Sequence, residues 1–129
     1  LRTASEKSID GPHLAEEIED LGKSDRRALA SHLQNLILHL LKWQYQSEKR
    51  NASWVASIRK SRKAAQKLLS ESPSLVPALD VLITEEYPDA RDAAIVETGL
   101  RGQNFPISCP YSTVQLGDPG YPLDLPEAK

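Results

Sequence analysis

The chain has 129 residues, the usual length of one domain with a single core. Aromatic residues make up only 5% of it, and Leu and Ala dominate the apolar content, which favours helices over sheets. No apolar run in this sequence is long enough to span a membrane, and its first residues lack the pattern of a signal peptide. The single Cys109 cannot form an internal disulfide. We therefore expect a cytoplasmic protein with no membrane association.

The net charge of −2 conceals an uneven distribution along the sequence. Residues 1–25 carry three basic and seven acidic side chains, residues 26–71 carry ten and two, and residues 72–129 carry three and nine. The middle third is therefore strongly basic and the outer thirds are acidic.

The first two predicted helices form a hairpin. Residues 12–21 begin with Pro12, which suits the first helical position, and are followed by Gly22, a natural C-terminal cap. The second helix has Ser24 as its N-cap and continues to Tyr45. So short a turn predicts that these two helices are antiparallel neighbours.

The third helix is predicted to begin near residue 47 or 52 and to end at Ser70. The fourth begins at Ser72 and ends at Gly99. Pro88 should kink the fourth helix, because proline removes one hydrogen bond and clashes with the preceding turn.

The last 31 residues contain four Gly and five Pro, which excludes a long helix. Ser112 could cap one short turn. Apolar residues are expected to pack this tail onto the helices, namely Phe105, Ile107, Tyr111 and Leu116. The prediction is an all-α, up-down antiparallel four-helix bundle over residues 1–100, with a kinked last helix. An irregular Pro/Gly-rich tail, residues 101–129, completes the single domain.

Four strings of the sequence are familiar in combination: "LAEEIEDLGKSDRRALASHLQNLILHLLKWQYQSEKR", "SWVASIRKSRKAAQKLLSESPSL", "YPDARDAAIVETGL" and "FPISCPYS". Together they resemble the bacterial domain-of-unknown-function family 29 over roughly residues 13–116. The resemblance implies an all-helical fold and no established activity. Family members usually begin with a further N-terminal segment. Since this chain starts at Leu1 and contains no Met, we expect that sequence precedes it.

A helical wheel of the second predicted helix separates an apolar arc from a polar seam. At about 100° per residue the arc runs along one side, with Trp43 at its border. The arc comprises Leu29, Leu33, Leu36, Ile37, Leu40 and Leu41, and the seam comprises His32, Asn35, His39, Lys42 and Gln46. The favoured interpretation of the seam is a hydrogen-bonded rim of the buried face.

A catalytic interpretation of the seam stays open. Its candidates are His32 or His39 as acid or base, with Lys42 and Arg59, in a cleft where this helix meets the next one. The chain has no nucleophile elbow, Gly-rich phosphate loop or zinc-type Cys pair. Cys109 is expected to be a packed residue instead of a nucleophile.

The sequence contains one candidate metal site. His32 and His39 are seven residues apart, about 10.5 Å along a helix, so they cannot share one ion. His13 and Glu17 stand at i,i+4, and the predicted hairpin would place His32 opposite them. An ordinary hydrogen bond between His32 and a carboxylate across that hairpin is favoured over a metal, and no cofactor is predicted.

The sequence "RKSRKAAQK" gives the third predicted helix a basic face, which is the electrostatic footprint of a polyanion-binding protein. The face comprises Arg59, Lys60, Arg62, Lys63 and Lys67. Two other interpretations are a solvated helix face and neutralisation by the acidic helices. The sequence pI of about 5.9 and the scarcity of aromatic residues argue against a dedicated nucleic-acid-binding protein.

Three classes of function therefore remain. A protein-interaction or assembly module, for example a homodimer, is favoured because no convincing catalytic set is present. The alternative is a nucleic-acid-binding protein that uses the basic helix. An enzyme, for example a nuclease with a His/Lys/Arg cleft, is the third.

Overall fold

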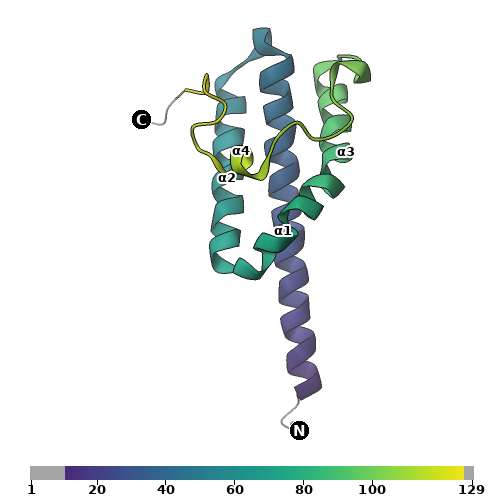
Figure 1. The fold of residues 1–129 in the computed structure, drawn as a ribbon, viewed down its shortest axis with the longest axis vertical. Helices are drawn as coiled ribbons and strands as arrows, with labels where there is room; N and C mark the ends of the chain where they lie inside the picture. The colour runs from purple at the N-terminus through teal and green to yellow at the C-terminus, as the bar shows by residue number, and fades with distance from the viewer. Residues whose placement is uncertain (1–10, 127–129) are drawn as a thin grey trace.

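The computed structural model describes residues 11–126, with side chains from residue 22 onward (Figure 1). The described chain is helical and contains no strand, which confirms the predicted all-α class. Its α-helices are α1 (Gly11–Tyr45), α2 (Ala52–Glu71), α3 (Leu79–Thr98) and the short α4 (Thr113–Gly117). Three 3-10 helices complete the elements: Ser47–Lys49, Pro73–Ala78 and Gly102–Asn104.

The predicted turn at Gly22 is wrong, because α1 continues through this residue as one helix of 35 residues. A glycine inside a helix costs only about 1 kcal/mol relative to alanine, and no proline follows it to break the hydrogen bonding. Among the described residues, the glycine that has the positive φ typical of a helix C-terminal cap is Gly99. The predicted hairpin is therefore absent, and three long helices with the short α4 replace the predicted four-helix arrangement.

The core is centred on α1, which packs against both α2 and α3 and lies between them in its C-terminal half (Figure 1). The predicted apolar arc is confirmed, since all six of its residues are buried, as is Trp43. From α2, Trp54 and Ile58 are buried against it, and from α3, Ile83 and Tyr87. Removing this apolar surface from water is the main source of stability.

The boundaries of α2 agree with prediction, and α3 begins later than predicted. The segment after Ser72 forms the 3-10 helix Pro73–Ala78 before the α-helix starts at Leu79. α3 continues through Pro88 and ends, as predicted, at Gly99, whose φ is 72°. The kink at Pro88 stays a prediction.

The tail crosses one face of the helices and returns toward the loop between α1 and α2 (Figure 1). As predicted, Phe105, Tyr111 and Leu116 are buried. Ile107 is 81% exposed, so its predicted burial is wrong. Apolarity alone does not fix which side of an irregular segment faces the core; here hydrogen bonds to the preceding carbonyl groups orient the backbone.

The predicted cap at Ser112 is confirmed and is reciprocal. The Ser112 hydroxyl accepts a hydrogen bond from the Gln115 amide (3.1 Å), and the Ser112 amide donates to Gln115 Oε1 (3.0 Å). This capping box begins α4, which lies against α2.

Candidate functional site

The helix α2 begins at a well-formed cap and buries one stripe against α1. The side chain of Asn51 accepts a hydrogen bond from the Trp54 amide (3.0 Å), as an N-cap residue should. Trp54, Ile58 and Ala65 are buried at helical spacing on the side that faces α1. This orientation decides which of the basic side chains of α2 reach solvent.

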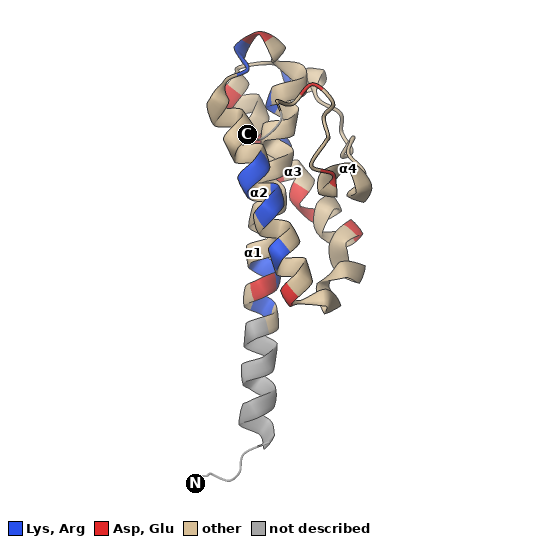
Figure 2. Ribbon diagram, turned by 90° about the vertical axis from the view of Figure 1, so that its left-hand side faces the viewer, with Lys and Arg blue, Asp and Glu red and all other residues tan. Residues whose placement is uncertain are grey.

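Four basic side chains form what we call the outer face of α2: Arg59, Lys60, Lys63 and Lys67. The three lysines are exposed and Arg59 is half-buried. No acidic residue occurs in α2 before Glu71. Figure 2 shows Lys and Arg, without Asp or Glu, along the middle of α2. Among the described side chains no ion pair involves this face.

The acidic helix α3 does not neutralise this face. α3 carries six acidic residues and one basic residue, but it packs on a different side of α1. Its ion pair with α1 joins Glu97 Oε1 to Lys42 Nζ at 2.7 Å. The sequence left open that acidic residues of the fourth predicted helix neutralise the basic face. Among the described side chains, no ion pair joins α3 to the outer face of α2. The acidic side chains before residue 22 lie outside the described residues.

Arg62 was predicted on the exposed basic face, and that prediction is wrong. Only 3% of Arg62 is exposed. Its Nε donates to the Leu116 carbonyl (2.7 Å) and its Nη2 to the Gln115 carbonyl (3.2 Å). Burial lowers its pKa from the usual value, and the negative charge of Asp118 opposes that shift. Arg62 therefore serves the C-terminal carbonyl groups of α4, which need donors.

The polar seam of α1 forms contacts to both neighbouring helices. The Lys42 ammonium group, besides its ion pair with Glu97, lies 5.0 Å from the centre of the Trp54 ring. Gln46 Nε2 donates to the Thr98 carbonyl (3.1 Å), and Asn35 Nδ2 donates to a serine hydroxyl of α2. These contacts agree with the favoured interpretation of the seam as a hydrogen-bonded rim.

The four catalytic candidates are absent from the lining of the three pockets described for this part of the chain. His39 Nδ1 is hydrogen-bonded to the Asn35 carbonyl, and burial lowers the pKa of His39. Lys42 is paired, His32 is half-buried on α1, and Arg59 lies on α2. Those three pockets are lined by other residues. A catalytic role for these residues stays a prediction.

The predicted metal ligands are not brought together. His13 and Glu17 lie outside the residues whose side chains are described. His13 and His32 belong to one helix, in which 19 residues correspond to about 28 Å along the axis. The hairpin that would have placed them opposite each other is absent. No group of three or more His, Cys, Asp or Glu side chains among the described residues could hold a metal ion.

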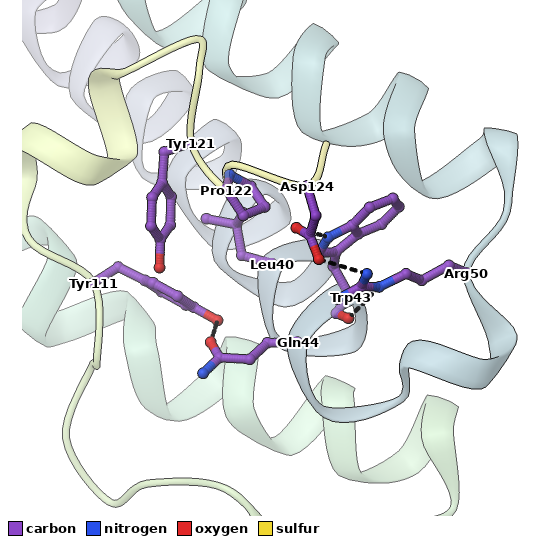
Figure 3. Close-up of a pocket in the computed structure, with 8 residues that line it drawn as sticks. All are labelled: Leu40, Trp43, Gln44, Arg50, Tyr111, Tyr121, Pro122 and Asp124. Carbon is purple, nitrogen blue, oxygen red and sulfur yellow. Dashed lines mark hydrogen bonds and ion pairs between the residues drawn. The ribbon is translucent and has the colours of Figure 1, made fainter. Parts of the chain in front are cut away.

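A pocket of about 130 Å³ lies at the C-terminal end of α1, beneath the last described segment of the tail (Figure 3). Asp124 accepts hydrogen bonds there from Trp43 Nε1 (2.9 Å) and Arg50 Nη1 (2.6 Å). The Arg50 guanidinium lies 4.3 Å from the centre of a Trp43 ring, and its Nε donates to the Trp43 carbonyl. The lining residues are Leu40, Trp43, Gln44, Arg50, Tyr111, Tyr121, Pro122 and Asp124.

The polar groups of this pocket are paired with one another. Hydrogen bonds from Trp43 and Arg50 lower the pKa of Asp124. The Tyr111 hydroxyl donates to Gln44 Oε1 at 2.8 Å. The arrangement therefore anchors the tail to α1, and its charges are already compensated. Sequence analysis missed this network, because Arg50 and Asp124 are 74 residues apart and neither belongs to a motif.

The environment of Cys109 favours the thiol. The residue is half-buried, and burial raises its pKa. Its Sγ donates to the Tyr111 carbonyl at 3.6 Å. This agrees with the prediction of a packed residue, since a nucleophilic cysteine needs a lowered pKa.

The described residues form an all-helical domain whose basic side chains gather on the outer face of α2. The chain belongs to the family described as domain of unknown function DUF29, whose sequence profile matches residues 1–122. This confirms the resemblance found in the sequence. No curated protein and no solved structure matches the chain. No helix in the described range is long and apolar enough to cross a membrane.

Proposed function

We propose that this domain is a protein-interaction module that binds an acidic surface of a partner protein through the outer face of α2. The observation that carries the proposal is the exposure of Lys60, Lys63 and Lys67, beside the half-buried Arg59, with no ion pair among the described side chains. The neighbouring Arg62 already serves the fold, because it donates to the Leu116 carbonyl.

The expected interaction is electrostatic and sensitive to salt. Each exposed ion pair contributes only about 0–1 kcal/mol, so several lysines must act together. Charges of one sign on one face also steer an oppositely charged partner during diffusion. Because the Debye length is about 8 Å at physiological salt, the contacts weaken as salt rises.

A protein partner fits this surface better than a nucleic acid. The outer face of α2 lacks an aromatic side chain on which a base could stack. The six acidic residues of α3 would repel a long polyanion that wrapped around the domain. Nucleic-acid binding remains the second candidate, because the same lysines could contact phosphates. A second copy of the chain is one possible acidic partner through its own α3.

The test measures binding of the purified protein to labelled poly-glutamate, DNA and RNA by fluorescence anisotropy at low and moderate salt. We expect poly-glutamate to bind at low salt and to be released as salt increases. The triple variant Lys60→Glu, Lys63→Glu, Lys67→Glu should bind at least about tenfold more weakly, since three favourable contacts become repulsive.

The matched control reverses an exposed charge away from this face, Lys49→Glu, which should leave binding nearly unchanged. Analytical ultracentrifugation at the same salt concentrations reports whether a second copy is the partner. Tighter binding of DNA or RNA than of poly-glutamate would favour the second candidate. If no polyanion binds even at low salt, the proposal is wrong.

A further inference from the structure

The side of α3 opposite its buried residues carries exposed carboxylates, as the outer face of α2 carries exposed lysines. Glu85, Asp89 and Asp92 are exposed, and no ion pair involves them among the described side chains. The single basic residue of α3, Arg91, is occupied by carbonyl groups of the tail. Burial and the negative charges of Asp89 and Glu85 raise the pKa of Glu86. The negative charge of this side is therefore uncompensated among the described side chains.

Two exposed valines continue this acidic stripe at both ends. Val81 is 51% exposed and Val96 is 80% exposed. They stand four residues before Glu85 and four residues after Asp92, so helical spacing places them on the same stripe. A single exposed apolar residue is ordinary on a protein surface. Here the two valines bracket the charges, so a partner that covers the carboxylates also covers apolar surface. We call this stripe the outer face of α3: Val81, Glu85, Asp89, Asp92 and Val96.

The charges of the two outer faces match when they are read in opposite directions. Backward from Lys67 the lysines are four and then three residues apart, and forward from Glu85 the carboxylates are also four and then three apart. Each set therefore spans seven residues, about 10.5 Å. In an antiparallel arrangement every lysine lies opposite one carboxylate. The pairs are Lys67 with Glu85, Lys63 with Asp89, and Lys60 with Asp92, and the same register places the exposed Ala56 opposite Val96.

The two outer faces cannot meet within one copy of the chain. α1 packs against α2 on one side and against α3 on another, and α2 and α3 run in opposite directions (Figure 1). A second copy in the same orientation therefore brings its α2 antiparallel to the α3 of the first, which is the direction that the register requires. Because two different faces make the contact, each copy keeps one face free, and such a heterologous assembly continues head to tail.

We propose that the outer face of α2 binds the outer face of α3 of a second copy, so that copies of this chain assemble head to tail. The proposal rests on the proposed function, because it names the acidic surface that the lysines bind. One helix face is a small interface and each exposed ion pair adds only about 0–1 kcal/mol, so the assembly forms at high protein concentration and low salt. The same rise in salt that releases poly-glutamate dissociates it.

The first experiment is sedimentation velocity of the full chain over a range of protein concentrations, at low and moderate salt. We expect the mean sedimentation coefficient to rise with protein concentration at low salt and to return to that of a monomer at moderate salt. Asp80→Asn removes an exposed charge of α3 that lies outside its outer face, and this control should associate normally. A monomer at every concentration at low salt would overturn the proposal.

Two neutral variants test which faces meet. One carries Lys60→Gln, Lys63→Gln and Lys67→Gln, and the other carries Glu85→Gln, Asp89→Asn and Asp92→Asn. Each variant alone should associate at least about tenfold more weakly, with the fold intact by circular dichroism. When mixed, they supply one acidic and one basic outer face, so they should form a one-to-one dimer that grows no further. Undiminished association of either variant, or a mixture that stays monomeric or grows beyond the dimer, would overturn the proposal.

An exchange of charges tests the register. Lys63→Asp should weaken the association, and adding Asp89→Lys to the same chain should restore it, because both members of the proposed pair are reversed. Adding Asp80→Lys instead is the matched control and should not restore it. Equal rescue by the two lysine substitutions would overturn the antiparallel register.

The two proposals can fail separately. If poly-glutamate binds the outer face of α2 while the chain stays monomeric at low salt, the head-to-tail assembly is wrong and the proposed function stands. If the chain stays monomeric and no polyanion binds, both proposals are wrong.

Discussion

Arg62 and Lys63 are adjacent in the sequence, yet they belong to two different regions of α2. Arg62 lies on the side that faces α4 and is 3% exposed, whereas Lys63 is exposed on the outer face of α2. One step of about 100° around the helix separates a residue that holds the fold together from one that is available to a partner. The number of basic residues in a segment therefore does not give the size of its binding surface.

The same contrast applies to other basic residues of the chain. Arg91 donates to the carbonyl groups of Gly102 and Phe105, and Arg50 is paired with Asp124. Each of these guanidinium groups fixes part of the tail. Lysine, with its flexible stem and compact charge, supplies most of the outer face of α2, while arginine, with its planar set of donors, supplies the internal contacts.

The largest effect is expected from replacing Arg62. Arg62→Ala should lower the free energy of unfolding by about 2–4 kcal/mol, because two carbonyl groups of α4 lose their donors. Lys63→Ala should change it by no more than about 0.5 kcal/mol. Urea unfolding followed by tryptophan fluorescence measures both. Equal effects of the two substitutions would contradict the division of α2 into a structural side and a free side.

A smaller, pH-dependent effect is expected at the tail anchor. The pKa of Asp124 is lowered from 3.8, so the stabilisation from its ionised form is complete above that pH and is lost as pH falls below it. Acidification through this range should release the tail and change the fluorescence of Trp43. Trp54→Phe isolates that signal. Asp124→Asn should show no such transition, and an unchanged transition in this variant would assign it to another group.

The smallest effect is expected at Gly22. Gly22→Ala should stabilise the protein by about 0.5–1 kcal/mol, because a Cβ there meets no atom within 4 Å and alanine favours a helix. Thermal unfolding by circular dichroism measures the change. A loss of stability would indicate that Gly22 adopts a left-handed cap conformation. That result would support the predicted hairpin over the continuous helix.

Much of the fold could be predicted from local patterns. The apolar arc of α1 repeats at helical spacing and is buried, Gly99 ends α3, and Ser112 caps α4. The turn at Gly22 could not be decided, since a glycine two residues before a serine suits both a cap and a helix interior. Ile107 illustrates a similar limit: its apolarity was visible, but the direction of its side chain depends on distant hydrogen bonds.

The candidate site could be predicted only in part. The three lysines of the outer face follow from helical spacing and the buried stripe of Trp54, Ile58 and Ala65. The burial of Arg62 depends on where α4 docks, 53 and 54 residues further along the chain. Contacts at such sequence separation leave no periodic signal in a single sequence.

The tail is held largely through its own main chain. Arg91 and Tyr87 donate to the carbonyl groups of Gly102, Phe105 and Pro106, and Arg62 and Gln66 donate to those of residues 115–117. Every amino acid offers the same carbonyl group. Exposed positions of the tail can therefore diverge between homologues while its path over the helices is preserved. Sequence variation should be concentrated in the acceptor residues outside the core, and constraint in the four donors and in the buried Phe105 and Leu116.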